Sequence, residues 1–125
     1  MRNMSFALTT EQIFNRTKTV TRRVGWTFLK PGDLLCAVRK GQGMKKGEKV
    51  ERLATLRVVS VRRESLDRMI LDLKYGLAET CKEGFPNGPF VFPRAFVEWF
   101  CEGHNCKLDD DVTRIEFKYV DGERA

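Results

Sequence analysis

The sequence predicts an α+β protein, built as one domain over residues 1–125 on a small, partly closed β-barrel with short covering helices. Three observations favour this class. Strand-like stretches outnumber helical ones, no strand–helix–strand repeat recurs, and the helical stretches are too short to serve as crossovers in a parallel sheet. A chain of 125 residues can close one modest core, so a second domain is not expected.

Five stretches rich in β-branched and apolar residues are expected to form strands. They cover residues 4–8, 17–24, 34–39, 53–61 and 113–119. The third follows the turn Lys30-Pro31-Gly32-Asp33, in which proline presets φ and glycine accepts a positive φ. The fourth loses its alternation near Val58 and Val59, which indicates a bulge or a strand buried on both faces. The last alternates cleanly and should therefore be half exposed.

Short helices are expected between these strands. Thr9 and Gln12 form a capping box, which predicts a short helix directly after Thr9. Ser65 is expected to cap a second helix, because apolar residues follow it with helical spacing. That stripe consists of Leu66, Met69, Ile70 and Leu73. A further short helix over residues 77–82 should end at Gly84.

The last expected helix begins at Pro93, a residue suited to the first helical position. Phe96, Trp99 and Phe100 then share one face, which we expect to belong to the core. Gly103 is expected to end this helix.

The composition is that of an ordinary globular protein, with 42% hydrophobic and 32% charged residues. No window approaches the roughly 18 apolar residues of a membrane-spanning helix, and the N-terminus lacks the apolar run of a signal peptide. We therefore expect a cytoplasmic protein without membrane association, in which the four cysteines stay reduced.

The net charge of +6 is unevenly distributed. Residues 1–68 hold 16 lysines and arginines against 6 acidic residues, whereas residues 69–125 hold 7 against 11. A basic half on a small domain favours a polyanion or a phosphate as partner. Within it, Lys45, Lys46 and Lys49 lie in a glycine-rich loop and are expected to attract a nucleic-acid backbone. The alternative is an ordinary solvated surface.

Four short motifs follow one another between residues 4 and 120. They are Lys18-Thr19-Val20-Thr21-Arg22-Arg23, Leu29-Lys30-Pro31-Gly32-Asp33-Leu34, Glu83-Gly84-Phe85 and Ile115-Glu116-Phe117. In this order and spacing they resemble the ASCH family, in which a lysine- and threonine-bearing strand precedes a P-G-D turn, an E-G-F element and a closing strand. The resemblance implies a PUA-like barrel that binds RNA, single-stranded nucleic acid or a nucleoside.

Some bacterial ASCH proteins are small amidohydrolases that deacetylate acetylcytidine, and another branch is regarded as ribonucleases. Carried over by position, the resemblance implies catalytic roles for Lys18, Thr21 and Glu83, with Arg23 as a nearby arginine. The basic loop, the Arg22-Arg23 doublet and a longer segment around residues 85–103 depart from the amidohydrolases, so the substrate stays open.

These residue types suit such chemistry. A threonine hydroxyl becomes a nucleophile when a base removes its proton, and a lysine whose pKa is lowered by burial can be that base. Glu83 can orient Lys18 or donate a proton to a leaving amine. In a regular strand Lys18 and Thr21 point to opposite faces, so a shared site requires that Lys18 precedes the strand or that a bulge intervenes.

The leading hypothesis is a nucleotide- or RNA-binding protein, because binding requires less coincidence than catalysis. Lys18, Arg22 and Arg23 would hold a phosphate through charge-assisted hydrogen bonds. Trp26 would stack on a base, or else pack under the rim of the barrel. An amidohydrolase acting on a modified pyrimidine nucleoside is the second hypothesis. An interaction module whose basic face meets an acidic protein is the third.

Neither a metal nor a cofactor is expected. Cys101, His104 and Cys106 lie close together in the sequence, but they supply at most three zinc ligands within a cramped segment. The alternative to a zinc site is that Cys101 packs in the core and His104 lies in the turn after the last helix.

Overall fold

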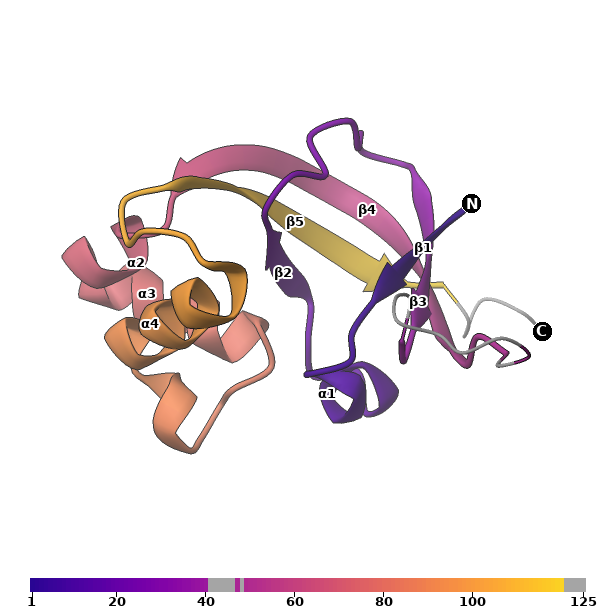
Figure 1. Ribbon diagram of the computed structural model, residues 1–125, viewed down its shortest axis with the longest axis horizontal. Helices are drawn as coiled ribbons and strands as arrows, with labels where there is room; N and C mark the ends of the chain where they lie inside the picture. Colours follow the sequence, from indigo (N-terminus) through magenta and orange to yellow (C-terminus); the bar gives the residue numbers. More distant parts are fainter. Residues whose placement is uncertain (41–46, 48, 121–125) are drawn as a thin grey trace.

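The computed structural model describes residues 1–40, 47 and 49–120. Five strands form one sheet in the order β1-β3-β4-β5-β2, and the sheet curls into a half-barrel (Figure 1). The strands are Arg2–Ser5 (β1), Val20–Arg23 (β2), Leu34–Val38 (β3), Arg52–Ser65 (β4) and Asp111–Tyr119 (β5). β1 pairs with β3 in parallel, and the other pairs are antiparallel. The expected α+β class with a partly closed barrel is confirmed.

β4 and β5 form a long antiparallel ribbon that runs the length of the molecule (Figure 1). The register shifts between Val58 and Ser60, which confirms the bulge predicted there. Such a bulge bends and twists the ribbon. β4 has 14 residues and pairs with β5 up to Ser65, so it is much longer than expected. Ser65 is therefore a strand residue and not a helix cap, and its hydroxyl donates to Asp67 Oδ1 at 2.6 Å.

The first of two cores fills the barrel. Its fully buried side chains come from β1, β3, β4, β5 and the segments next to β1. Among them are Met4, Phe6, Ile13, Leu35, Leu56, Ile115 and Phe117. Ile13 belongs to α1 (Thr10–Phe14), the short helix expected after Thr9. The predicted capping box is wrong, because the Thr9 side chain caps nothing; instead the Thr10 hydroxyl donates to the Phe6 carbonyl at 2.9 Å.

The connection between β4 and β5 carries the remaining helices, which gather at one end of the ribbon (Figure 1). They are α2 (Arg68–Leu71), α3 (Leu73–Lys82), the 3₁₀ turn η1 (Pro89–Val91) and α4 (Pro93–His104). The expected stripe after Ser65 is broken at Asp72, whose carboxylate accepts from Tyr75 N at 3.2 Å and caps α3. The predicted apolar role of Leu73 is therefore wrong, since this residue begins a new helix and is 61% exposed.

These helices enclose a second core against the far end of the ribbon. Its members include Leu66, Met69, Phe96, Val97, Phe100 and Val112. The expected burial of Phe96 and Phe100 on one face of α4 is confirmed. None of the helices in the described part of the chain combines the length and the apolar character needed to cross a membrane.

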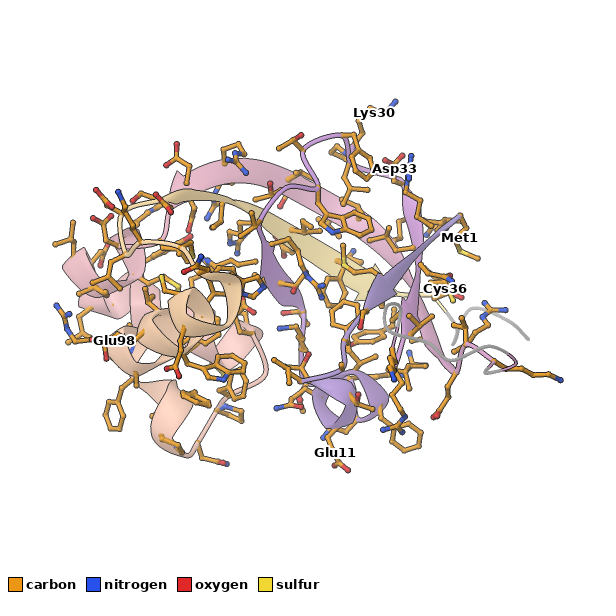
Figure 2. All side chains as sticks on the ribbon, viewed as in Figure 1. Met1, Glu11, Lys30, Asp33, Cys36 and Glu98 are labelled. Atoms are coloured by element: carbon orange, nitrogen blue, oxygen red, sulfur yellow. The ribbon has the colours of Figure 1, made fainter. Side chains whose placement is uncertain are left out.

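Two smaller expectations concern β3 and β5. The predicted turn before β3 is confirmed: Asp33 N donates to Lys30 O at 3.1 Å, and Gly32 has a φ of 94°. Figure 2 labels Lys30 and Asp33 at this turn. The half-exposed face predicted for β5 is wrong at Arg114, which is 3% exposed. α3 covers this part of the ribbon, and its Glu79 carboxylate binds the Arg114 guanidinium.

Candidate functional site

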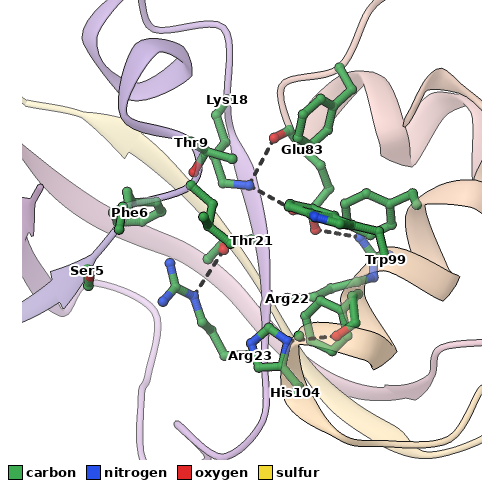
Figure 3. A pocket seen from close by; sticks show the side chains of 16 residues that line it. Ser5, Phe6, Thr9, Lys18, Thr21, Arg22, Arg23, Glu83, Trp99 and His104 are labelled. Atoms are coloured by element: carbon green, nitrogen blue, oxygen red, sulfur yellow. Dashed lines mark hydrogen bonds and ion pairs between the residues drawn. The ribbon is translucent and has the colours of Figure 1, made fainter. Parts of the chain in front are cut away.

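A cavity of about 270 Å³ lies where the barrel meets the helices (Figure 3). The segment after β1, the edge strand β2, the loop after α3 and one face of α4 each contribute to its wall. Its polar lining residues are Ser5, Thr9, Lys18, Thr21, Arg22, Arg23, Glu83 and His104. The cavity therefore brings the predicted Lys18, Thr21, Arg22, Arg23 and Glu83 to one place.

Lys18 and Thr21 share this cavity because Lys18 precedes the strand. β2 begins at Val20, and Lys18 N, in the segment after α1, donates to Gln12 O at 3.2 Å. The Lys18 carbonyl accepts from the Tyr119 hydroxyl at 2.6 Å. These two bonds set the backbone of Lys18, so its side chain is not bound by the alternation of a strand and can reach the same cavity as Thr21.

Glu83 is placed by the end of α3 and by the glycine after it. Glu83 is the C-cap of α3, and Gly84 has a φ of 105°. A Cβ at position 84 would lie 2.7 Å from Gln12 Cγ and 3.4 Å from Lys18 Cβ. Only glycine lets α3 end this close to the segment that carries Lys18.

Lys18 and Glu83 form a buried ion pair. The Lys18 ammonium donates to Glu83 Oε1 at 2.8 Å and to the Glu83 carbonyl at 2.9 Å, and both side chains are at most 4% exposed. Burial lowers the pKa of Lys18, and the charge and hydrogen bond of Glu83 act in the opposite direction. Lys18 therefore loses its proton at a pH closer to neutrality than an exposed lysine does.

Arg22 lies on the other face of β2 from Thr21 and Arg23, within a buried network of carboxylates. Its guanidinium binds Glu83 Oε2 at 3.0 Å, Glu64 Oε2 at 2.8 Å and Glu79 Oε1 at 2.6 Å. Burial opposes its charge, but these three carboxylates raise the pKa of Arg22. The side chain has no exposed surface, so its two terminal NH₂ groups serve the protein and not a bound phosphate. Its Nε is buried and has no hydrogen-bond partner among the described residues.

Arg114 completes the charge balance of this network. It binds both Glu79 oxygens, at 2.5 and 3.0 Å, next to Arg22 on the paired strand. Burial disfavours the Glu79 anion, but Arg114 and Arg22 together lower the pKa of Glu79 to about 2. Lys18, Arg22 and Arg114 thus face Glu64, Glu79 and Glu83, so three buried cations match three buried carboxylates.

Arg23 is the cation that this network leaves over. Its Nε–H donates to Thr21 Oγ1 at 3.1 Å, and its guanidinium lies 4.7 Å from the centre of the Phe6 ring. Its two terminal NH₂ groups have no hydrogen-bond or ion-pair partner within the part of the chain that the structure describes. Burial lowers the pKa of Arg23 to about 10, so it keeps its charge at neutral pH beside a cavity without a counterion of its own.

Aromatic side chains form much of the remaining wall. Phe6, Phe85, Phe96, Trp99 and Phe100 line the cavity. As expected, Trp99 packs against the second core, but it is only half-buried and also lines the cavity. Gly103, which follows one turn after Trp99 on this face, has no atom near its missing side chain and leaves space there. The sequence signal for this open space is the small residue Gly103 on the aromatic face of the helix.

His104 is a second lining residue that sequence reasoning missed. Its ring stacks on Phe100, with centroids 4.1 Å apart, and its Nδ1 lies 2.9 Å from the Phe100 carbonyl. A carbonyl only accepts, so Nδ1 carries the hydrogen and donates, and the neutral ring offers Nε2 as an acceptor. His104 is exposed and lies at the edge of the cavity.

The other predicted binding residues lie elsewhere. Trp26 packs against the barrel core, with its ring 5.4 Å from that of Phe28, and lies outside the cavity wall. Lys49 is exposed and also lies outside the wall, whereas Lys45 and Lys46 fall outside the described residues. Trp99 lines the cavity and is half-buried, and one face of its ring stacks on Phe90 with centroids 4.7 Å apart, so a ligand base would have to stack on the other face.

The cysteine and histidine segment holds no metal-ligand cluster. Within the described residues, no group of three or more histidine, cysteine, aspartate or glutamate side chains could hold a metal ion. His104 Nδ1 is taken by the Phe100 carbonyl, and the thiol of Cys101 is buried against that of Cys106.

The arrangement offers two kinds of chemistry. Arg23 can bind an anion or a carbonyl oxygen while aromatic rings hold a flat group beside it. Thr21 can act as a nucleophile if the neutral Lys18 amine takes its proton, and the Glu83 carboxylate keeps Lys18 in place. Figure 3 shows Lys18, Thr21 and Arg23 on one side of the cavity, and Glu83 and Trp99 across from them.

Several solved structures resemble this chain. The hypothetical protein PH0355 has a TM-score of 0.60 and 18% sequence identity, over 96% of this chain and 100% of its own. An ASCH domain from Lactobacillus crispatus JV V101 has a TM-score of 0.58 and 12% identity, over 95% of this chain and 79% of its own. Protein EF3133 from Enterococcus faecalis V583, described with the family DUF984, has a TM-score of 0.61 and 14% identity, over 95% of this chain and 75% of its own. Neither a protein-family model nor a curated protein matches the sequence significantly.

Proposed function

The chain has an ASCH-like fold, and on that basis we propose that it binds a nucleotide in the cavity between barrel and helices. The nucleotide is either free or an unpaired nucleotide of single-stranded RNA. Arg23 contacts its phosphate, and the ring of Trp99 stacks on its base.

The unpaired guanidinium of Arg23 is the observation that carries this proposal. Arg23 is half-buried, and a cation that has lost part of its hydration without gaining a counterion is stabilised when an anionic ligand binds it. Arginine suits this task because its planar NH₂ groups match the oxygens of a phosphate. Thr21 and Phe6 hold the side chain in one orientation, so little entropy is lost on binding.

The dimensions and lining of the cavity fit a single nucleotide. Its volume of about 270 Å³ lies just below the range of about 300 to 1,000 Å³ that is usual for small-molecule pockets, so only a small ligand fits. A duplex could not enter, whereas one splayed base with its sugar could. Aromatic walls supply the stacking surface that unpaired bases use.

Calorimetric titration with cytidine 5′-monophosphate and with cytidine tests this proposal. We expect the monophosphate to bind more tightly, because only it offers an anion to Arg23. The substitution Arg23→Gln should weaken monophosphate binding by about 10- to 100-fold, the usual range for a lost charge-assisted hydrogen bond, and leave cytidine binding nearly unchanged.

Arg63→Gln is the matched control, since Arg63 is exposed on β4 and binds the Thr113 hydroxyl at 2.8 Å outside the cavity. It should bind both ligands as the unaltered protein does. Equal affinity for nucleotide and nucleoside, or full monophosphate affinity in Arg23→Gln, would reject the proposed phosphate contact. A short single-stranded oligonucleotide separates the two sources: an RNA site gives tighter binding with a steeper salt dependence than the monophosphate.

A second candidate function is amide hydrolysis on an acetylated pyrimidine nucleoside. The observation that favours it is that Lys18, Thr21 and Glu83 line one cavity, with the Lys18 ammonium bound by Glu83 and its pKa lowered by burial. In this scheme the neutral form of the Lys18 amine takes the proton of the Thr21 hydroxyl, Thr21 attacks the acetyl carbonyl, and Arg23 stabilises the developing oxyanion. The amide C–N bond then breaks, and the leaving cytidine amine receives the proton from Lys18. Water hydrolyses the acetyl ester of Thr21 and releases acetate.

Proton NMR of the protein incubated with N4-acetylcytidine tests this scheme. Hydrolysis would appear as released acetate and cytidine, and both Thr21→Ala and Lys18→Ala should abolish it. Activity that survives both substitutions would rule out these roles, and binding of acetylcytidine without turnover would leave the nucleotide-binding function alone.

A further inference from the structure

The thiols of Cys101 and Cys106 touch at the end of α4. Their sulfur atoms are 3.5 Å apart, with the Cys106 thiol donating to Cys101. Cys101 is buried, whereas Cys106 is half-buried and accessible. The other two cysteines lie on β3 (Cys36) and α3 (Cys81) and take no part in this contact.

The backbone at the helix end fixes this contact. Asn105 ends α4 in the left-handed region, with a φ of 52°, and Cys106 N donates to the Cys101 carbonyl at 3.2 Å. This is the long hydrogen bond of a Schellman motif, which brings the side chains of the two linked residues together. Disulfides require cysteines whose Cβ atoms are close and face one another. Two sulfur atoms already in contact meet this requirement with small side-chain rotations.

We propose that Cys101 and Cys106 are a site of reversible oxidation, at which a small-molecule disulfide such as oxidised glutathione converts the two thiols into one intrachain disulfide. Disulfides in reducing compartments usually serve redox sensing and not structure. The bond would close a covalent ring across the last turn of α4, the turn that also carries Phe100 and His104 of the cavity wall. The proposal does not depend on what the cavity binds.

The chemistry proceeds in two balanced exchanges. The Cys106 thiolate attacks one sulfur of oxidised glutathione and forms a mixed disulfide, and one glutathione thiolate leaves. The Cys101 sulfur then attacks Cys106 Sγ, and the second glutathione leaves. The protein loses two protons and two electrons, and oxidised glutathione becomes two molecules of the reduced form.

The two cysteines differ in the role they can take. Burial, together with the nearby Cys106, raises the pKa of Cys101 to about 12, so Cys101 is the poorer first nucleophile. Cys106 is accessible and makes the first attack. The part of the effect on Cys101 that comes from Cys106 disappears once Cys106 is in the mixed disulfide, which favours the second exchange.

Peptide mapping of the folded chain tests this proposal. The protein is incubated with oxidised glutathione, free thiols are blocked with iodoacetamide, and the chain is digested with trypsin. Residues 95–107 form one tryptic peptide with both cysteines. We expect this peptide to lack two hydrogen atoms, to carry no blocking group, and to accept two such groups only after reduction. A persistent single glutathione adduct, or two blocked thiols, would overturn the proposal.

Two substitutions test whether the helix end supplies the proximity. Asn105→Gly retains the left-handed conformation, whereas Asn105→Val disfavours it. In a glutathione redox titration we expect Asn105→Gly to behave as the unaltered chain and Asn105→Val to form the disulfide on the order of tenfold less favourably. This explanation would be contradicted if the disulfide of Asn105→Val, or that of the unaltered chain unfolded in urea, were as stable as the disulfide of the folded, unaltered chain.

Discussion

Removal of Arg22 should destabilise the fold strongly, and by an amount that depends on pH. Breaking a buried ion pair usually costs about 3 to 5 kcal/mol, because a charge is left without its partner. Arg22 binds Glu64, Glu79 and Glu83, but each of these keeps another cation: Arg62, Arg114 and Lys18 respectively. We therefore expect Arg22→Met to lower the free energy of unfolding by about 3 kcal/mol at neutral pH, the lower end of this range.

The pH dependence follows from the carboxylates. Arg22 helps to lower the pKa values of Glu64 and Glu79 in the folded state. It therefore contributes stability that is complete above the pKa that these carboxyl groups have in the unfolded chain, and this stability is lost as the pH falls. Without Arg22 these carboxylates accept protons more readily in the folded state. The difference in stability between the unaltered protein and Arg22→Met should therefore shrink as the pH falls below about 4.5, toward the folded-state pKa of Glu79 near 2.

Urea unfolding followed by circular dichroism measures both quantities, provided that the dependence on urea concentration is unchanged. Arg62→Met is the control, because Arg62 binds the same Glu64 from a half-exposed position and should cost about 1 kcal/mol or less. A loss below about 1 kcal/mol in Arg22→Met, or a difference between the two proteins that is constant with pH, would refute the assigned role of Arg22.

Two further predictions concern stability. The Glu79 carboxylate, with its pKa near 2 in the folded state, should contribute about 3 kcal/mol that is present above about pH 4.5 and lost as the pH falls toward 2; Glu79→Gln should flatten this part of the acid unfolding curve. Gly84→Ala should cost about 2 kcal/mol or more in thermal unfolding, because of its positive φ and the contact with Gln12, whereas Gly103→Ala, in open space on α4, should stabilise by roughly 0.5 to 1 kcal/mol. Equal effects of the two glycine substitutions would contradict this reasoning.

The elements that follow local rules could be predicted from the sequence. The turn at Pro31-Gly32 and the bulge near Val58 depend on a few neighbouring residues, and the structure contains both. The break at Asp72 could not be derived from the apolar stripe, because its capping carboxylate competes with helix propagation. The length of β4 depends on its pairing with β5, and the partner of Ser65 is Asp111, more than 45 residues later in the sequence.

The residues of the site were predicted more successfully than their roles. Motif resemblance suggested Lys18, Thr21 and Glu83 as a group, and they line one cavity. The doublet Arg22-Arg23 predicts a shared phosphate contact, but neighbours in a strand face opposite ways. That alternation alone would have separated them. The partners of Arg22 are Glu64, Glu79 and Glu83, and no sequence pattern places these carboxylates together.

The helices α2, α3 and α4 and the turn η1 lie within a single β-hairpin, formed by β4 and β5. Ser65 at the end of β4 pairs with Asp111 at the start of β5, and Leu66 N donates to Asp110 O at 3.0 Å, so the segment leaves and re-enters the ribbon at one point. Lengthening or shortening such a closed excursion changes loop entropy only slowly and leaves the strand register intact. Evolution could therefore remodel the wall formed by α4, and with it ligand preference, while the opposite wall on β2 stayed unchanged.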